Sequence, residues 1–322
     1  MTLLLTERDV QSLLTMDLAL EAVEAAFHDL AAGAGSVNQA RRRIPLKNGT
    51  LHYMAGALPV QGVLGLKMYP VVAGRVTFLV PLYSVETGRL LALIEADYLG
   101  RMRTGAASGV ATKYMARPDA KTLGLFGTGG QARTQLLAVC AVRPIEQVRV
   151  YGRSPEKRAA FVREMQPLVN AQLMAVDQPR AAVEGADVVV TMTTASQPVF
   201  SGEWLTPGAH INAAGGNHLQ RREIDGVTVR RCGRIAVDML EQARLECGDL
   251  AAAVAEGLLT WEAVTEFADI VAHKAPGRAA ADEITLFESH GLAVWDLATA
   301  VRVYELAVQR GVGQSIPLFA DN

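Results

Sequence analysis

The sequence predicts an α/β protein in which a doubly wound parallel sheet is joined to an N-terminal α+β domain. Three observations predict this fold class. From Thr122 onward short apolar strands alternate with helices, a glycine-rich turn follows the first of these strands, and the preceding residues combine two helices with a run of β segments. Alternating strands and helices are typical of a parallel sheet covered on both faces.

The composition is that of an ordinary α/β chain long enough for two domains, and it excludes several classes of partner. The 322 residues are 50% hydrophobic and 20% charged, with a formal net charge of -2. This charge gives no electrostatic reason to expect nucleic acid or an acidic membrane as partner. The N-terminus fits no signal peptide, and no apolar run approaches the ~20 residues of a membrane span.

Cysteine and histidine usage indicates a reducing compartment and no metal. The three cysteines, Cys140, Cys232 and Cys247, show no paired spacing, so we expect a cytoplasmic protein. The six histidines form no HxxxH or HxH cluster, and we therefore expect no structural or catalytic metal.

The N-terminal third predicts two helices followed by β structure. Thr6 is a natural N-cap for a short first helix, and a second helix is expected over 17–32, where Gly33 ends it. Pro81 has no N–H to donate, so its strand is expected to lie at an edge or to carry a bulge. Glu86–Arg89 is expected to be the turn of an antiparallel hairpin. The expected strands are 50–58, 63–69, 76–83 and 90–96.

A long helix with small residues in its middle is expected to follow. Asp97 is its expected cap, it runs over 98–116, and Pro118 closes it. The small residues of 105–109 fit either tight packing against a neighbouring element or close approach of a ligand. The later elements are expected to be strands at 122–126, 147–151, 173–176, 188–191, 210–212 and 235–237, and helices at 131–142, 155–165 and 292–309.

The turn Gly127-Thr128-Gly129-Gly130-Gln131-Ala132 predicts a dinucleotide site. It directly follows an apolar strand and opens a helix, which is the context that this interpretation requires. Gly127 permits the tight turn, Gly129 lets the backbone approach a pyrophosphate, and the helix N-terminus offers free N–H groups. A purely structural turn is the alternative.

The end of the next strand favours NADP(H) over NAD(H), which remains possible. NAD-selective sites place Asp or Glu here to accept a hydrogen bond from the ribose 2′-hydroxyl. No carboxylate lies within Tyr151–Ser154, whereas Arg153 and Ser154 are suited to a 2′-phosphate. Alternatively, Arg153 is a solvated loop residue or stacks on the adenine.

Basic residues of the N-terminal region predict a carboxylate site. Lys67 lies within the apolar run 63–69, and a buried lysine needs an anionic partner. Arg103 lies in the first two turns of the small-residue helix, where the helix N-terminus also favours anions. With Arg43, these residues are candidates for holding a substrate carboxylate, although each alone would ordinarily be a surface residue.

Two further segments follow parallel strands and are expected at the ligand-binding edge of the sheet. These are Thr193-Thr194 and the loop Gly215-Gly216-Asn217-His218. Asn217 or His218 is a candidate to face a nicotinamide ring. A lone loop histidine is more often exposed, so His218 is the weaker candidate as a proton donor.

Together these segments resemble the ornithine cyclodeaminase/μ-crystallin family over nearly the whole chain. The resemblance rests on Gly65-Leu66-Lys67, Glu86-Thr87-Gly88, Arg103–Gly109, Gly127–Ala132, Ile211–Asn217 and Phe287–Ala293. It implies a Rossmann domain, here 118–299, joined to an N-terminal substrate and dimerisation domain, here 1–117. It further implies that the C-terminal segment 300–322 packs back on the N-terminal domain and that the protein is a homodimer.

The resemblance also implies roles for individual residues. Arg43, Lys67 and Arg103 match positions that hold the substrate's α-carboxylate, and His290 lies where this family touches the substrate. Residues that match or lie near cofactor contacts are Thr77, Arg103, Gly129, Gly130, Thr193, Ala214, Arg221 and Ser289.

Asn217 is the informative departure from the cyclodeaminases. Enzymes of that activity resemble this loop but carry Asp there, and Asn cannot accept a proton at any useful pH. Met54 stands where an acidic residue would receive a diamino acid's distal amine. Members with Asn or Ser in the loop resemble alanine dehydrogenases, ketimine reductases and pyrroline-2-carboxylate reductases.

We therefore expect NAD(P)H-dependent reduction of an imine of an α-keto acid, either cyclic or formed from pyruvate and an amine. Lys67, Arg103 and Asn217 are the expected catalytic residues, with Lys67 anchoring the carboxylate and polarising the imine nitrogen. Two alternatives stay open, a redox-neutral cyclodeaminase and a μ-crystallin-like protein that binds NADPH and a small ligand without turnover.

Overall fold

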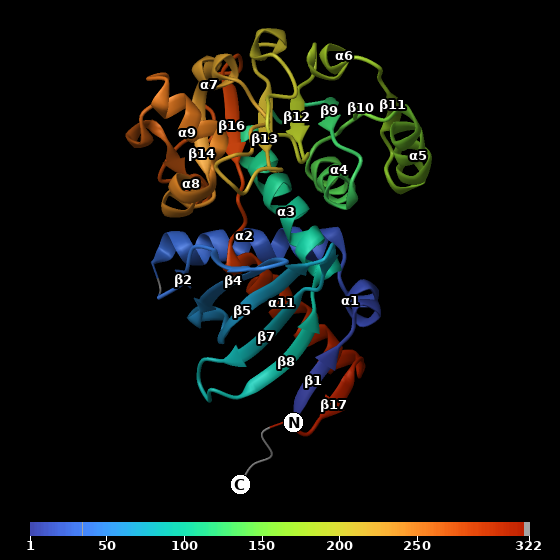
Figure 1. Ribbon diagram of the computed structural model, residues 1–322, viewed down its shortest axis with the longest axis vertical. Helices are drawn as coiled ribbons and strands as arrows, with labels where there is room; N and C mark the ends of the chain where they lie inside the picture. Colours follow the sequence, from blue (N-terminus) through green and yellow to red (C-terminus); the bar gives the residue numbers. More distant parts are fainter. Residues whose placement is uncertain (34, 319–322) are drawn as a thin grey trace. The chain divides into compact units, whose positions relative to one another are not determined.

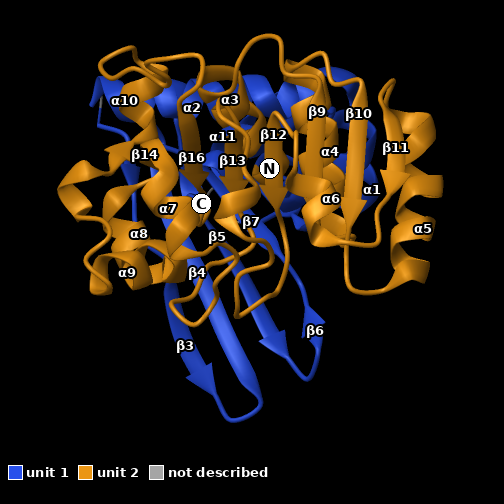
Figure 2. Cartoon of the chain, turned by 90° about the horizontal axis from the view of Figure 1, so that it is seen from above, with its two compact units in different colours: residues 1–103, 292–322 blue, residues 104–291 orange. Residues whose placement is uncertain are grey.

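The structure is a computed structural model that describes residues 1–33 and 35–318. The chain forms two compact units, Met1–Arg103 with Leu292–Asn322 as unit 1 and Thr104–Gly291 as unit 2 (Figure 2). The units divide inside a helix and just before the last helix, so their limits differ from 1–117 and 118–299. The two units are defined by compactness, so the expected domain ranges 1–117 and 118–299 stay a prediction. Residues 319–322 of the expected segment 300–322 lie outside the described residues.

The first two helices form where their caps predict them. In α1 (Glu7–Leu13), the Thr6 hydroxyl accepts from the N–H of Asp9 while the Asp9 side chain accepts from the N–H of Thr6. This reciprocal capping box satisfies N–H groups that the first turn leaves without partners. In α2 (Met16–Ala32), Thr15 caps the start and Gly33, with φ of 62°, ends the helix.

Unit 1 contains a mixed sheet whose strands follow the order β17-β1-β8-β7-β5-β4-β2, with β3 beside β4 and β6 beside β5. Helix α11 (Ala293–Arg310) packs on β4, β5 and β7 and also contacts α2 (Figure 1). The bounds are β1 Thr2–Leu5, β2 Val37–Asn38, β3 Arg42–Leu46, β4 Gly49–Leu58, β5 Val63–Val72, β6 Arg75–Val76, β7 Leu79–Ser84, β8 Leu90–Glu95 and β17 Gln314–Ile316.

The strand of Pro81 lies inside the sheet, so of the two expected alternatives the irregular pairing applies and the edge position does not. β7 lies between β5 and β8, and Pro81 is paired with Leu93 of β8. The pairing is irregular as expected: the register with β8 shifts between Leu82 and Tyr83, and Pro81 has no partner in the register with β5. A local irregularity therefore accommodates the missing N–H inside the sheet.

Helix α3 (Asp97–Met115) contains the division between the units. The sequence predicts Asp97 as the N-terminal cap of this helix. That prediction is wrong, because Asp97 is already the first residue of the helix. The Glu7 carboxylate of α1 instead accepts from the N–H groups of Asp97 and Tyr98 at 2.5 and 3.0 Å. Within unit 2, a Cβ on Gly105 would lie 2.4 Å from the carbonyl oxygen of Thr134, which establishes tight helix packing as one reason for the small residues.

Unit 2 is the doubly wound parallel domain that the sequence predicts. In its described residues eight strands, all parallel, follow the order β11-β10-β9-β12-β13-β16-β14-β15 (Figure 1). The strands are β9 Thr122–Phe126, β10 Gln147–Tyr151, β11 Gln172–Ala175, β12 Val188–Thr191, β13 His210–Ala213, β14 Cys232–Val237, β15 Thr265–Glu266 and β16 Ile284–Glu288.

Helices cover this sheet, and the strands alternate between two apolar cores. Val188 and Val190 belong to one core and Val189 to the other, which is the burial expected of a sheet covered on both faces. The helices are α4 Gly130–Val142, α5 Pro155–Met165, α6 Pro179–Val183, α7 Gly226–Arg231, α8 Leu240–Glu246, α9 Gly248–Ala255 and α10 Phe267–Val271. The described residues contain no helix long and apolar enough to cross a bilayer.

The strand order of unit 2 defines where a ligand binds. β10 and β11 lie on one side of β9, whereas β12 and β13 lie on the other, so the order reverses beside β9. Open parallel sheets bind ligands at this switch point, outside the carboxyl ends of the strands. Phe126, Thr191, Ala213 and Glu288 form one row of register partners across the sheet. The loops that follow them therefore begin at the same edge.

Candidate active site

Lys67 is buried in unit 1 and paired with a carboxylate. It lies on β5 opposite Met54 of β4, and its Nζ is 2.9 Å from Oδ1 of Asp296 on α11. Burial, reinforced by the nearby charge of Arg103, lowers the pKa of Lys67 to about 8, although Asp296 acts in the opposite direction. A Cβ on Gly100 would lie 2.8 Å from Nζ, so a side chain larger than glycine would displace the lysine head.

Arg103 shares the same carboxylate oxygen. Its Nε donates to Asp296 Oδ1 at 3.0 Å, and its guanidinium lies 5.8 Å from the centre of the Trp295 ring. Its Nη1 is buried and has no hydrogen-bond partner among the described residues. Two buried cations therefore share one carboxylate, and an unsatisfied guanidinium donor beside them suits an additional anion.

Arg41 is the cation of this region that sequence reasoning missed. It is buried, its Nη1 donates to the Tyr69 hydroxyl at 2.5 Å, and its charge acts on Lys67. Arg43, the expected carboxylate contact, lies on β3 opposite His52 and is half-buried. In the sequence the two arginines are two positions apart, the spacing that puts side chains on one face of an extended chain, and this spacing could have indicated Arg41.

The glycine turn of unit 2 has the geometry of a dinucleotide turn. Gly127 has φ of +118°, and a Cβ there would lie 2.3 Å from the carbonyl oxygen of Met192. Gly129 is the N-cap of α4 and gives no side-chain cap, while a Cβ on it would meet nothing within 4 Å. The first N–H groups of α4 and the space above Gly129 thus fit a pyrophosphate. Gln131 Oε1 is also buried without a partner among the described residues.

The Glu223 carboxylate accepts hydrogen bonds from two of the loops that follow the parallel strands. Its Oε1 accepts from the N–H and hydroxyl of Thr193 at 2.7 and 2.6 Å, and its Oε2 accepts from the N–H of Gly215 and the hydroxyl of Thr191 at 2.8 and 2.9 Å. Burial raises the pKa of Glu223, although these four hydrogen bonds oppose the shift. Sequence reasoning selected Thr193 and Gly215 but missed the carboxylate that positions both.

Other candidate residues begin at the same edge. Ala214 donates its N–H to the carbonyl of Thr191, and Ser289 donates to that of Ala213. Asn217 and His218 are exposed in the loop after β13, and His218 Nδ1 accepts from the N–H of Gln220. Arg221 donates to the carbonyl of Thr194. Thr77 belongs to unit 1 and is exposed between β6 and β7.

The end of β10 carries both a cation and an acid. Arg153 is exposed, in the loop between β10 and α5. Ser154 caps α5 by accepting from the N–H of Lys157, and its hydroxyl donates to Glu156 at 2.7 Å. This hydrogen bond lowers the pKa of the Glu156 carboxyl. Sequence reasoning did not weigh Glu156, which lies outside the segment 151–154.

His290 is buried at the end of unit 2 and is held by Asp238. Its Nδ1 is 3.4 Å from Asp238 Oδ1, while the N–H groups of His290 and Gly291 donate to Oδ2 at 2.6 and 2.7 Å. Its neighbour Ser289 is also buried. The sequence gives no signal for Asp238, because the acid is distant along the chain.

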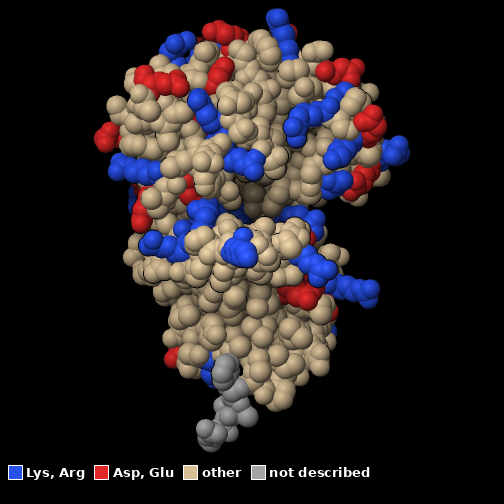
Figure 3. Space-filling view, viewed as in Figure 1, with Lys and Arg blue, Asp and Glu red and all other residues tan. Residues whose placement is uncertain are grey.

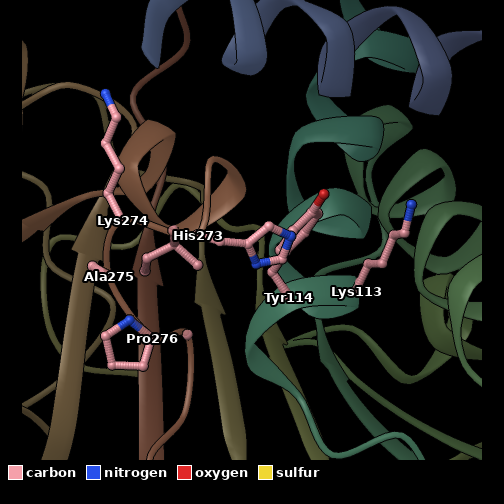
Figure 4. A pocket seen from close by; sticks show the side chains of 8 residues that line it. Lys113, Tyr114, His273, Lys274, Ala275 and Pro276 are labelled. Carbon is pink, nitrogen blue, oxygen red and sulfur yellow. The ribbon is translucent and has the colours of Figure 1, made fainter. Parts of the chain in front are cut away.

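A pocket of about 710 Å³ lies elsewhere on unit 2 (Figure 4). Lys113 and Tyr114 of α3 and the segment around His273 line it. Tyr114 contacts the His273 ring, whose residue has φ of +57°. None of the residues selected from the sequence lines this pocket, so it is not the candidate active site.

The fold and the glycine turn define the class of dinucleotide-binding α/β proteins. Comparison with known proteins agrees with this class. Residues 1–311 match the ornithine cyclodeaminase/mu-crystallin family. A Delta(1)-pyrroline-2-carboxylate reductase of Bacillus cereus is 36% identical over 98% of this chain and 99% of its own length. The chain therefore belongs to the ornithine cyclodeaminase/mu-crystallin family, as the sequence motifs predict.

Solved structures agree with this assignment. The Delta(1)-pyrroline-2-carboxylate reductase of Thermococcus litoralis, in complex with NADH and L-proline, aligns with a TM-score of 0.92 and 38% identity, covering 98% of this chain and 100% of that one. An archaeal alanine dehydrogenase dimer with bound NAD aligns with a TM-score of 0.92 and 35% identity, covering 99% of both chains.

Proposed function

We propose that this protein is an NAD(P)H-dependent oxidoreductase that reduces an imine of an α-keto acid to an amino acid. The observation that carries the proposal is the buried arrangement of Lys67 and Arg103 around Asp296, with an unsatisfied donor on Arg103. An α-carboxylate is the anion that such a substrate brings. Relatives named as reductases of cyclic imines, one of them solved with NADH and L-proline, support the same chemistry.

The cofactor supplies a hydride when it is bound. Gly127–Gln131 would hold its pyrophosphate, because this turn exposes backbone N–H groups and leaves space above Gly129. Thr193, Ala214, Gly215, Asn217, Arg221 and Ser289 are proposed to hold the remainder. Glu223 would act through Thr193 and Gly215 as a positioning residue.

The chain's own contribution to the reaction is anchoring and proton control. Arg103 and Lys67 would bind the substrate carboxylate, assisted by Arg41, and Asp296 would keep both heads in place. A protonated imine accepts a hydride without a strong acid, so positioning supplies much of the rate. With a pKa of about 8, Lys67 also suits donation of a proton to an imine that arrives neutral.

The test is an activity screen with NADPH and NADH. The panel contains pyrroline-2-carboxylate, piperideine-2-carboxylate, and pyruvate with ammonia or methylamine. Cofactor oxidation with formation of the amino acid supports the proposal. Conversion of ornithine to proline with ammonia release would instead establish the cyclodeaminase reaction, against which Asn217 speaks.

We also propose the finer cofactor preference that the sequence predicts, NADPH over NADH. Arg153 is exposed at the end of β10 and is suited to a 2′-phosphate. Glu156, which accepts a hydrogen bond from Ser154, is a nearby negative charge that would repel a 2′-phosphate and so lower the preference for NADPH. The ratio of kcat/KM for NADPH and NADH tests it.

A homodimer built on unit 1 is proposed as the working assembly, in a cytoplasmic setting. The face over the strands of this unit carries few charged side chains (Figure 3). Exposed apolar residues of its strands are Val37, Ile44, Leu46, Leu64 and Val76. Exposed apolar side chains, when they gather on one face, mark association surfaces. Light scattering after size exclusion gives the oligomeric mass, and Leu64→Asp is expected to lower it.

A further inference from the structure

Buried carboxylates of unit 2 differ in how many hydrogen bonds they accept. Glu223 accepts from four donors, Asp249 from the N–H groups of residues 223 and 224, and Asp238 from those of residues 239, 290 and 291. Glu288, the last residue of β16, is 3% exposed and hydrogen-bonds with the Cys247 side chain, yet its Oε1 has no hydrogen-bond partner among the described residues. A buried carboxylate in this condition requires a proton or a cation.

Two side chains with metal-binding chemistry lie beside Glu288. Cys247 is buried between α8 and α9, and His290 follows Glu288 by two residues. The ligand atoms of Cys247, Glu288 and His290 all lie within 4.8 Å of one another. A tetrahedral ion with bonds of ~2.0–2.3 Å separates its ligands by about 3.5 Å, so small side-chain movements would close the site.

The surroundings favour a cation at this place. Asp238 lies 3.4 Å from Nδ1 of His290, and a carboxylate on one ring nitrogen is the usual means of orienting a metal-binding histidine. The negative charges of Asp249, Glu223 and Asp238 also act on Glu288. A divalent ion would offset this concentration of negative charge.

We propose that Cys247, Glu288 and His290 bind one divalent metal ion of zinc-like chemistry. A thiolate, an imidazole and a carboxylate are the donor types that zinc takes in proteins, and three protein ligands leave a position for water. This departs from the expectation of no metal, which rested on histidine spacing. Spacing misses the group because Cys247 lies 41 positions before Glu288 in the sequence, outside any short ligand motif.

The experiment measures metal content directly. Full-length protein is purified without chelators, incubated with Zn²⁺ or Co²⁺, desalted and analysed by plasma mass spectrometry. About one ion per chain is expected, with a visible Co²⁺ spectrum that indicates tetrahedral coordination including a thiolate. Binding should also release protons, which calorimetry in two buffers detects.

Ligand variants and a matched cysteine control locate the ion. Cys247→Ser and Glu288→Gln are expected to lose most of the bound metal and the Co²⁺ spectrum, whereas Cys232→Ser, altered in the same unit, should retain both. Wild-type protein that binds no ion after incubation, or a Cys247→Ser protein that binds as the wild type does, overturns the proposal. If a variant folds poorly, the metal content of the wild-type protein still tests the proposal, because that measurement needs no variant.

Discussion

Lys67 Nζ lies 2.9 Å from Asp296 Oδ1, although the two residues are 229 positions apart in the sequence. Both side chains are buried, and Arg103 donates to the same oxygen. Asp296 therefore holds two cationic heads in a fixed arrangement without neutralising both. This arrangement is the basis of the predictions about substrate binding.

Removing the lysine head should weaken substrate binding more than cofactor binding. Lys67→Met keeps the side-chain length and removes the charge, so kcat/KM for an imine carboxylate should fall about 10- to 100-fold, the typical value of a lost charged hydrogen bond. The dissociation constant for NAD(P)H, measured by fluorescence, should change little. Equal loss of both affinities would indicate general unfolding, as would a lowered melting temperature.

Activity should decline at alkaline pH. Charged Lys67 is the form that binds a carboxylate, and its pKa is about 8, so kcat/KM should fall as pH rises through that value. Because Asp296 raises this pKa, Asp296→Asn should move the decline to lower pH. A pH profile of the variant that coincides with that of the wild type would contradict this role of Asp296.

Two glycine substitutions separate folding from cofactor binding. Gly127→Ala places a Cβ 2.3 Å from a carbonyl oxygen at φ of +118°, so the melting temperature should fall together with cofactor affinity. Gly129→Ala meets no protein atom within 4 Å, so the fold should persist while the methyl group occupies the proposed pyrophosphate space. Thermal melts and NADPH titrations check both; unchanged affinity in Gly129→Ala would place the phosphates elsewhere.

Substitution of Glu223 should disturb two loops at once. Glu223→Gln keeps the volume but cannot accept all four hydrogen bonds, so NAD(P)H affinity should fall about tenfold or more. Glu203→Gln, at an exposed position of unit 2, is the matched control and should behave as wild type. An effect on melting temperature alone would give Glu223 a purely structural role.

Two residues after β10 should set the cofactor preference in opposite directions. Arg153→Ala is expected to lower kcat/KM for NADPH, whereas Glu156→Gln is expected to raise it, because one removes a cation and the other an anion near the proposed 2′-phosphate. Steady-state kinetics with both cofactors measures the ratio. Variants that leave this ratio unchanged would remove both residues from the cofactor site.

Six strands of the parallel sheet were predictable from the sequence because each is a short apolar run followed by a helix or a polar loop, whereas β15 and β16 were not predicted. β12 (Val188–Thr191) and β9 (Thr122–Phe126) form at the expected positions. The short strands β1 and β17 were not predicted, because they are only four and three residues long and depend on pairing with distant partners.

The site was predictable where a local motif carries the chemistry, and not where a distant partner does. Gly127 and Gly129 are identified by the turn itself, and Lys67 by its apolar neighbours. Asp296 and Glu223 were missed because each is an ordinary acid in the sequence. Only the fold brings them to Lys67 and to Thr193, respectively.

The central claim is reduction of an imine whose carboxylate is held by Lys67 and Arg103. The most direct measurement is NAD(P)H oxidation with pyrroline-2-carboxylate and the other imines, with amino-acid product followed by mass spectrometry. The account predicts turnover in the wild type and strongly reduced turnover in Lys67→Met. Absence of turnover with every cyclic and acyclic imine, while the protein still binds NADPH, would contradict it.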